Sequence, residues 1–316
     1  MPQLPHDGRM SLCISVIGLG AWGGTLAALM QRQGHRIQSW SRSSGGDPAD
    51  ALAGADLALV ATSLKGASQL APSLGPQWPS HLPLVSCSKG LDLQGCATAS
   101  QIWRREGPQI PLLVLSGPNL ARELEQGLPA ASVLASEELE LARLWQRRLS
   151  GDQLRLYASA DPIGTEVVGA LKNVMAIAAG ICDGLALGAN AKASLLCRGL
   201  AEMGAVIEAL GGDNRSLYGL AGLGDLLATA NSSLSRNYRY GVALAEGLSA
   251  AEALDRVGAT VEGASTVQAV TAMADERQWH LPICQQVQAV MDGSIAPPQA
   301  VRALMQRDLK DEGAQA

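Results

Sequence analysis

A glycine-rich turn between an apolar β-branched run and an apolar helical run constrains this chain more than any other feature. Ile14–Ile17 is followed by G-x-G-x-x-G at Gly18, Gly20 and Gly23, and then by small and apolar residues at helical spacing up to Met30. This order predicts a strand, a tight turn and a helix. Gly18 permits the turn, Gly20 lets a pyrophosphate approach the backbone, and Gly23 lets the helix pack closely. The N–H groups that open the helix would then face the phosphates.

The same stretch also has the length of a membrane span, because no charged residue lies between Arg9 and Arg32. The glycines around a turn and the change of period from two to nearly four favour the strand, turn and helix instead. A signal peptide is not expected, because the apolar run continues into Gln31–Gly34, which is typical of a helix end. We predict a loose tail over residues 1–10.

Composition bounds the class of protein. A chain of 316 residues exceeds the usual size of a single core, so two domains are expected. A net charge of -5 argues against a non-specific nucleic-acid binder, which needs a basic face. The six cysteines are scattered without a C-x-x-C pair, so we expect no disulfide framework and no metal site. Reduced thiols in a cytoplasmic protein are the simplest interpretation.

Strand-like and helix-like segments alternate in the first half of the chain. Further strands are predicted within His35–Trp40, Ala55–Ala61, Leu82–Ser86 and Leu112–Leu115, and a helix within Ala97–Arg105. This alternation predicts an α/β fold with an N-terminal Rossmann-type, doubly wound parallel sheet. From Pro162 onward the pattern is helical, which predicts an all-helical C-terminal domain. We place the dinucleotide-binding domain at 11–158 and the substrate-binding domain at 159–316.

An apolar helix predicted over Gly164–Gly180 carries Lys172 and Asn173 side by side. A lysine there is costly unless its ammonium group reaches a cleft. Burial lowers a lysine pKa from about 10.4 toward neutrality, as an acid/base group for a carbonyl–alcohol couple requires. A lysine that snorkels from the helix edge explains the pattern equally well.

Three other segments combine polar groups with predicted element ends. Asp225, before an apolar helix, is most simply an N-cap. Ser235, Arg236 and Asn237 at a helix start form an anion-binding mixture, although a solvated turn is no less probable. Lys89 follows a predicted strand, where doubly wound sheets bind ligands, or is surface charge.

Together these segments make the chain resemble the NAD(P)-dependent glycerol-3-phosphate dehydrogenases of bacterial type. The motifs run in family order over nearly the whole chain. They are Gly18-Leu-Gly-Ala-Trp-Gly23, Ser88-Lys-Gly-Leu91, Ser116-Gly-Pro118 with Ala121 and Glu123, Gly169-Ala-Leu-Lys-Asn173, Gly222-Leu-Gly-Asp225, Ser235-Arg-Asn237 and Val261-Glu-Gly263.

The resemblance implies a role for each matched residue. It makes Lys172 the proton donor and acceptor at the substrate oxygen. The substrate-binding residues it implies are Lys89, Gly117, Asn119, Lys172, Asn173, Asp225, Ser235, Arg236 and Asn237. The cofactor-binding residues it implies are Gly18, Gly20, Ala21, Trp22, Gly23, Arg42, Lys89, Ala121, Arg236 and Glu262.

Three departures from the family pattern stand out. Asn119 replaces the usual Ser or Thr after Gly-Pro, and Ser63-Leu64 replaces the usual Pro-Ser after the third strand. The family's longer segment between the second and third strands, which carries an Asn-Tyr-Leu-Pro type motif and contributes to the adenosine end, is cut here to Arg42–Gly54. None of these changes touches the reaction centre.

The resemblance implies reduction of dihydroxyacetone phosphate to sn-glycerol 3-phosphate, for phospholipid synthesis. Ser41-Arg42 after the second strand, with no acid nearby, predicts a preference for NADPH with NADH tolerated. The expected partner is a small phosphorylated substrate, and a homodimer is the oligomeric state considered. We expect neither nucleic-acid binding nor stable membrane insertion. The alternatives are a β-hydroxyacid or ketopantoate-type reductase and a non-catalytic dinucleotide-binding regulator.

Overall fold

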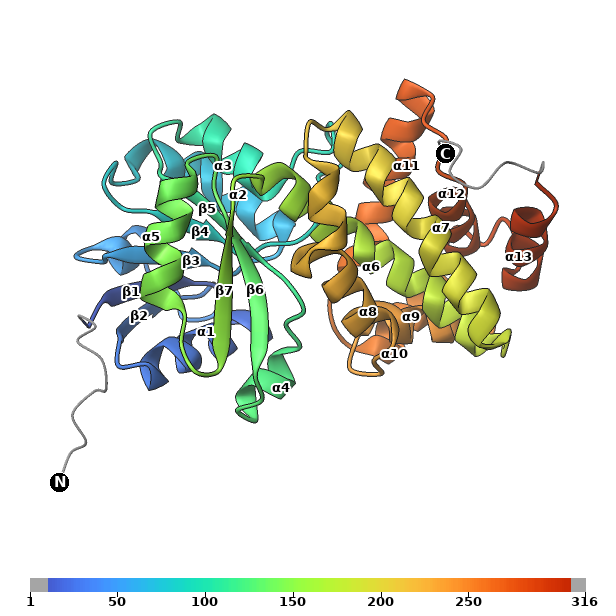
Figure 1. The fold of residues 1–316 in the computed structure, drawn as a ribbon, viewed down its shortest axis with the longest axis horizontal. Helices are drawn as coiled ribbons and strands as arrows, with labels where there is room; N and C mark the ends of the chain where they lie inside the picture. The colour runs from blue at the N-terminus through green and yellow to red at the C-terminus, as the bar shows by residue number, and fades with distance from the viewer. Residues whose placement is uncertain (1–10, 308–316) are drawn as a thin grey trace. The chain divides into compact units, whose positions relative to one another are not determined.

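The computed structural model describes residues 11–307, which form two compact units (Figure 1). The first unit comprises residues 11–88 and 99–162, and the second comprises 89–98 and 163–307. The ten-residue segment 89–98 therefore packs with the second unit although its neighbours in sequence belong to the first. The tail predicted over 1–10 lies outside the described residues, and the functional limits 11–158 and 159–316 stay a prediction.

The first unit is built on a seven-stranded sheet with the order β2-β1-β3-β4-β5-β6-β7. Its strands are β1 (Cys13–Ile17), β2 (Arg36–Trp40), β3 (Leu57–Val60), β4 (Leu84–Ser86), β5 (Leu112–Ser116), β6 (Ala130–Ala135) and β7 (Leu154–Ser159). All neighbouring strands are parallel except β5 and β6. The predicted fold class is confirmed, but β6 and β7 were not predicted, and the β5–β6 pair makes the sheet mostly rather than fully parallel.

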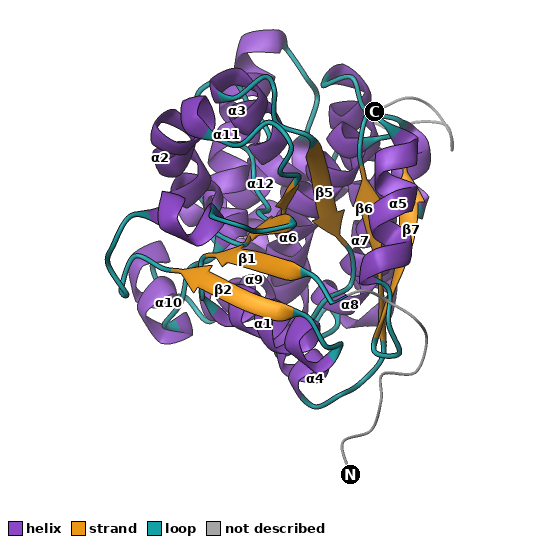
Figure 2. Cartoon of the chain, turned by 90° about the vertical axis from the view of Figure 1, so that its left-hand side faces the viewer, coloured by secondary structure: helices purple, strands orange, loops and turns teal. Residues whose placement is uncertain are grey.

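Helices flank this sheet, and Figure 2 shows them against the orange strands. They are α1 (Ala21–Arg32), α2 (Leu64–Leu74), α3 (Ala99–Glu106), α4 (Ala121–Glu125) and α5 (Leu139–Leu149), with short 3-10 turns at Pro48–Leu52 and Gly75–Gln77. Helix α1 packs against β1 and β2, and α5 packs against β6 and β7. Leu, Ile and Val side chains from these elements form one buried core around β1 and β3.

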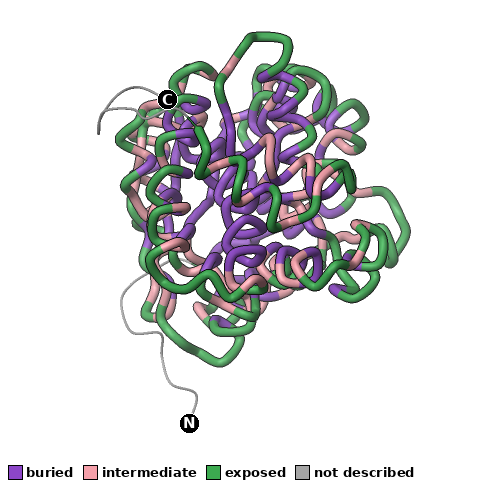
Figure 3. Tube along the Cα trace, turned by 90° about the vertical axis from the view of Figure 1, so that its right-hand side faces the viewer, coloured by how far each residue is buried: buried purple, intermediate pink, exposed green. Residues whose placement is uncertain are grey.

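The second unit contains only helices and turns within the described residues. Its helices are α6 (Pro162–Gly184), α7 (Gly188–Ala209), α8 (Asp225–Ala230), α9 (Arg236–Ala245), α10 (Ala250–Val257), α11 (Glu262–Arg277), α12 (Pro282–Met291) and α13 (Pro297–Met305), with a 3-10 turn at Asn214–Tyr218 and a π turn at Leu220–Gly224. Figure 3 shows buried segments inside and exposed ones outside. The predicted helical character of this half is confirmed.

Helix α6 is the core of the second unit. Among residues 11–307 it is the one helix long and apolar enough to cross a membrane, but 89% of its most apolar stretch is buried inside the protein. Its backbone approaches that of α9 closely. A Cβ atom built at Gly180 would lie 2.1 Å from the Tyr238 carbonyl oxygen, and a Cβ atom built at Gly241 would lie 2.1 Å from the Ile177 carbonyl oxygen. These contacts explain the apolar composition of α6 as close helix packing.

Candidate functional site

The glycine turn lies between β1 and α1, as predicted. Gly18 has φ +99, a conformation that L side chains rarely adopt, and its N–H donates to the Trp40 carbonyl at 2.8 Å. A Cβ atom at Gly23 would lie 1.8 Å from the Gly18 carbonyl oxygen and 3.1 Å from the Ala61 side chain. Both glycines are therefore required by the tight strand-to-helix connection.

The start of α1 is open above Gly20. Nothing lies within 4 Å of a Cβ atom built at Gly20, and this N-cap residue has no side chain to cap the helix. The first helical bond runs from Gly24 N–H to the Gly20 carbonyl at 2.8 Å, so the N–H groups of Ala21, Trp22 and Gly23 have no intrahelical acceptor. Such a helix start fits the pyrophosphate of a dinucleotide, because the helix dipole favours negative charge there.

The segment after β2 is short and ordered by its own hydrogen bonds. Ser41 and Ser44 close a tight turn, and Arg42 is exposed on it. The next acid along the chain, Asp47, accepts the Ala49 N–H at 2.9 Å and caps the following 3-10 turn. Gln38 in β2 donates to the Ala51 carbonyl at 2.7 Å. The shortened loop thus keeps a basic residue at the end of β2.

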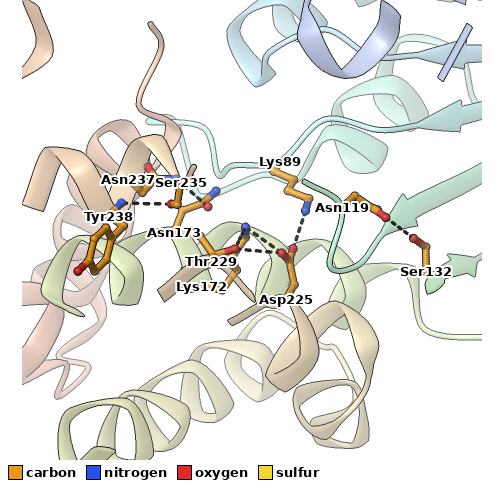
Figure 4. Close-up of polar contacts among 10 residues, drawn as sticks. All are labelled: Lys89, Asn119, Ser132, Lys172, Asn173, Asp225, Thr229, Ser235, Asn237 and Tyr238. Carbon is orange, nitrogen blue, oxygen red and sulfur yellow. Dashed lines mark hydrogen bonds and ion pairs between the residues drawn. The ribbon is translucent and has the colours of Figure 1, made fainter. Parts of the chain in front are cut away.

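The Gly-Pro segment after β5 rests on β6. A Cβ atom at Gly117 would lie 2.8 Å from Cα of Ser132, so only glycine fits this approach. The Ser132 hydroxyl donates to Asn119 Oδ1 at 2.8 Å (Figure 4). Asn119, which replaces the family's hydroxyl residue, therefore has its oxygen engaged by β6. Ala121, a predicted cofactor residue, is the first residue of α4.

A charged cluster in the second unit brings together three of the predicted substrate-site residues (Figure 4). Lys89 Nζ lies 2.5 Å from Asp225 Oδ2, and Lys172 Nζ lies 3.1 Å from Asp225 Oδ1. Lys172 Nζ also donates to the Thr229 hydroxyl at 2.7 Å, and that hydroxyl donates to Asp225 Oδ1 at 3.1 Å. We call Lys89, Lys172, Asp225 and Thr229 the lysine cluster. It holds two cations on one carboxylate.

Burial tunes the charges in the lysine cluster. The Lys172 side chain is only 8% exposed. Its pKa is lowered to about 8, mainly by burial and also by the positive charge of Lys89, although the negative charge of Asp225 raises it. Burial alone would raise the pKa of Asp225, but the two lysines hold it below its ordinary value. Lys172 therefore holds a proton that it can give up and recover near neutral pH.

Asp225 does not act as the N-cap that its sequence position favoured. Gly224 occupies the N-cap position, and residues 220–224 already coil as a π turn. No fresh helix start is therefore available for Asp225 to cap. Its buried carboxylate instead accepts from Lys89 and Thr229 and pairs with Lys172. Lys172 lies in the buried middle of α6 rather than at a helix edge.

Two of the three predicted asparagines, Asn173 and Asn237, bind each other. Asn237 Nδ2 donates to Asn173 Oδ1 at 2.8 Å, and Asn237 Oδ1 accepts the Gly263 N–H at 2.9 Å. Asn237 thereby ties α6, α9 and the start of α11 together. The carbonyl oxygen of Asn173 is therefore engaged by Asn237.

The start of α9 carries two more of the predicted substrate-binding residues, Ser235 and Arg236. Ser235 is buried and accepts the Tyr238 N–H at 3.2 Å, which makes it the N-cap of α9. Arg236 is exposed in the first turn. Partial burial raises the pKa of Glu262, while the positive charge of Arg236 lowers it. Ser235 is thus at a helix start, as expected, but it is buried rather than in a solvated turn.

Sequence reasoning missed Thr229 and the support behind α9. The signal for Thr229 was its position four residues after Asp225, which places both on one helix face. The hydroxyl of Tyr238 donates to Asp183 Oδ2 at 2.7 Å, and Lys192 Nζ lies 2.6 Å from the same oxygen. No cluster of three or more His, Cys, Asp or Glu that could hold a metal lies in residues 11–307.

In comparisons with known proteins, separate family models match the sheet-containing and the helical parts of the chain. The family model described as NAD-dependent glycerol-3-phosphate dehydrogenase N-terminus matches residues 44–142, and the corresponding C-terminus model matches 161–302. Glycerol-3-phosphate dehydrogenase [NAD(P)+] of Synechococcus sp. (strain RCC307) is 54% identical over 303 residues, which cover 96% of this chain and all of the relative. The corresponding enzyme of Nostoc sp. is 44% identical, with 95% of this chain and 98% of the relative covered.

A solved structure agrees with these relatives. Glycerol-3-phosphate dehydrogenase (gpsA) from Coxiella burnetii is 33% identical with a TM-score of 0.89, covering 94% of this chain and 99% of that one. The open glycine turn and the helical second unit define a dinucleotide-dependent dehydrogenase of two units. More closely, the chain belongs to the NAD(P)-dependent glycerol-3-phosphate dehydrogenase family. The resemblance seen in its motifs is confirmed.

Proposed function

We propose that this protein reduces dihydroxyacetone phosphate to sn-glycerol 3-phosphate with NADPH or NADH. The single observation that carries the proposal is the buried ammonium of Lys172, held between Asp225 and Thr229. Membership of the family supplies the substrate, and this geometry supplies a proton donor of suitable pKa.

The dinucleotide, when bound, supplies a hydride for the ketone carbon. Negative charge then grows on the carbonyl oxygen, and Lys172 Nζ gives that oxygen a proton to form the alcohol. In the reverse direction the neutral amine of Lys172 accepts the hydroxyl proton. Lys89 and Lys172 stabilise the growing charge electrostatically, because both cations are held in place by Asp225 before the reaction starts.

The phosphate end of the substrate is assigned to the start of α9. Arg236 and the Ser235 hydroxyl are the proposed anion-binding groups. Asn237 hydrogen-bonds with both Asn173 and Gly263, so its proposed contribution is to hold Asn173 toward the substrate. The substrate-binding roles of Gly117 and Asn119 in the first unit stay predictions.

The glycine turn is assigned to the dinucleotide, with Gly20 and the open start of α1 at the pyrophosphate. Arg42 is assigned to the 2′-phosphate of NADPH, because the following acid, Asp47, is engaged as a cap. We expect Arg42→Asp to reverse the ratio of kcat/KM for NADPH over NADH, whereas Arg36→Asp at the exposed start of β2 leaves it unchanged. An unchanged ratio in Arg42→Asp refutes this assignment.

The cellular context follows from the family alone. We propose that the product supplies glycerophospholipid synthesis in the cytoplasm. A homodimer is the assembly we would test first, by sedimentation of the purified protein, and a purely monomeric protein would refute it. Binding of nucleic acid and stable membrane insertion are not part of the proposed function.

The experiment follows NADPH absorbance with purified protein and dihydroxyacetone phosphate, then repeats it with NADH and with ketopantoate. Oxidation that depends on dihydroxyacetone phosphate supports the proposal. Activity with ketopantoate alone transfers the protein to a ketopantoate-type reductase. Binding of NADPH without turnover of either ketone indicates a dinucleotide-binding regulator.

A further inference from the structure

The segment Lys89–Thr98, which we call the strap, delivers Lys89 to the lysine cluster. The chain leaves the sheet-containing unit after Ser88 and rejoins it at Ala99, yet the strap packs with the helical unit. Its tip is exposed, with Leu93 at 64%. The position of the Lys89 ammonium therefore depends on how this ten-residue excursion is fixed to the helices.

Two internal hydrogen bonds close the strap into a small loop. Asp92 N–H donates to the Ala97 carbonyl at 3.0 Å, and Asp92 Oδ1 accepts the Ala97 N–H at 2.8 Å. The returning arm carries Cys96, which is buried and has φ 55. A left-handed backbone at a residue other than glycine is costly and persists only where the surroundings hold it.

A side-chain hydrogen bond attaches the closed loop to α11. The Cys96 thiol donates to the Ala269 carbonyl at 3.2 Å. Two turns earlier, α11 begins next to Gly263, whose N–H donates to Asn237. One helix therefore carries both the strap and the asparagine contact behind the proposed substrate site.

We propose that Asp92 and Cys96 are positioning residues that hold Lys89 against Asp225. The inference rests on the proposed function, because it assigns the strap a role in the same reaction. Asp92 shortens the loop, and Cys96 fixes the loop to α11. Together they restrict the backbone that precedes them, so that the Lys89 ammonium stays 2.5 Å from the carboxylate. Neither residue contacts the lysine cluster in this assignment.

Loosening the strap is expected to change the pKa of Lys172. The charge of Lys89 contributes to lowering the pKa of Lys172. When the Lys89 ammonium moves away, its repulsion of the Lys172 ammonium weakens and Asp225 pairs with Lys172 alone, so the pKa of Lys172 rises. The alkaline limb of the pH profile for ketone reduction, where Lys172 loses its proton, then shifts to higher pH. A residue that only stabilised the fold would lower the amount of active protein without this shift.

The test is a double-mutant cycle between Cys96→Ala and Lys89→Met. We expect Cys96→Ala to lower kcat/KM for dihydroxyacetone phosphate by about three- to tenfold, the effect of one lost hydrogen bond, and to shift the alkaline limb upward. In the Lys89→Met background the same change should have no further effect. Cys96→Ser, which keeps a donor, should recover part of the loss. Exposed Cys197→Ala and Gln94→Ala at the strap tip serve as matched controls.

Asp92→Ala provides a second variant if Cys96→Ala does not fold, and it should repeat the same loss, pH shift and dependence on Lys89. The proposal is overturned if the losses are equal in the presence and absence of Lys89, or if both variants behave like the wild type. A wild-type protein that does not turn over dihydroxyacetone phosphate refutes the proposed function instead. Urea unfolding of the wild type and the three variants of the cycle then tests the coupling between Cys96 and Lys89 without any substrate.

Discussion

The glycine turn and the lysine cluster are built by opposite means. The turn works through absent side chains, because Gly18 needs a positive φ, Gly23 has no room for a Cβ atom and Gly20 leaves the helix start open. The cluster works through side chains that are expensive to bury, with two lysines and one aspartate held together from distant parts of the chain. Backbone groups serve the first region, and charges serve the second.

Because of this difference, the two regions are sensitive to different kinds of substitution. A turn made of consecutive residues tolerates changes nearby but not the addition of one methyl group at Gly23. A buried cluster tolerates shape changes better than the loss of one charge, because an unpaired buried charge is costly.

Asp225→Asn removes the one carboxylate that serves both lysines. We expect the free energy of unfolding to fall by about 3–5 kcal/mol, as when one partner of a buried ion pair is lost. Asp225 also raises the pKa of Lys172, so the alkaline limb of ketone reduction should move to lower pH. Urea unfolding and a pH–kcat profile measure both effects, with exposed Asp255→Asn as the control. An unmoved alkaline limb would show that Lys172 does not feel this carboxylate.

Glu202 is a buried carboxylate that is held by backbone N–H groups, in contrast to Asp225, which is held by lysines. It accepts the N–H groups of Ile283 and Cys284 at the start of α12, and burial raises its pKa from 4.5 to about 7. The folded protein therefore binds this proton more tightly than the unfolded chain does. The resulting stability is present below pH 4.5 and is lost as the pH rises through about 7.

The expected size of this effect is about 3 kcal/mol, because the pKa is 4.5 in the unfolded chain and about 7 in the folded protein. Urea unfolding between pH 4.5 and 8 measures it in the wild type. Glu202→Gln should remove this part of the pH dependence, whereas Glu208→Gln on the exposed face of the same helix should keep it. Equal pH slopes in all three proteins would contradict the raised pKa of Glu202.

Gly23→Ala tests the turn. The new Cβ atom would lie 1.8 Å from the Gly18 carbonyl oxygen, so α1 must shift, at a cost of about 1–3 kcal/mol. We expect NADPH to bind roughly ten- to hundredfold more weakly in a fluorescence titration. Gly24→Ala is the matched control, because nothing lies within 4 Å of its Cβ position and alanine favours the helix. Equal binding by the two variants would break the proposed role of the turn.

Tyr238→Phe tests the hydrogen bond that joins α9 to Asp183 in α6. It removes the hydrogen bond to Asp183 but leaves the Lys192 ion pair, so about 1 kcal/mol of stability should be lost. We expect KM for dihydroxyacetone phosphate to rise by less than about tenfold, because α9 carries Ser235 and Arg236. Tyr218→Phe, at an exposed position, is the control. A change in kcat alone would argue against a role at the substrate end.

The sequence was sufficient to predict the turn, the fold class and the helical second half. The turn is local, since Gly18, Gly20 and Gly23 act through their own backbone. The early strands alternate with helices at short spacing. Strand β7 escaped prediction because exposed Arg155 and Tyr157 interrupt the continuous apolar run that buried strands show. Strand β6, with the sequence AASVLA, is rich in alanine and serine, which are weak strand formers.

The arrangement of the lysine cluster could not be predicted from pattern alone. The pattern fitted a snorkelling lysine at Lys172 equally well, allowed surface charge at Lys89 and favoured an N-cap at Asp225, so only family motifs linked the three residues. For Asp225 the local rule gave an N-cap, which was wrong because the preceding π turn had already begun the helix. Thr229 and the Cys96 contact depend on tertiary packing, and no local pattern encodes them.

The central claim is that Lys172 carries the proton while a separate turn binds the dinucleotide. The direct measurement compares Lys172→Met with the wild type in two assays on the same sample, NADPH titration by fluorescence and reduction of dihydroxyacetone phosphate. The account predicts unchanged NADPH affinity and a loss of about 10²–10⁴-fold in kcat, the usual contribution of a general acid. Turnover within about tenfold of the wild type would contradict the account.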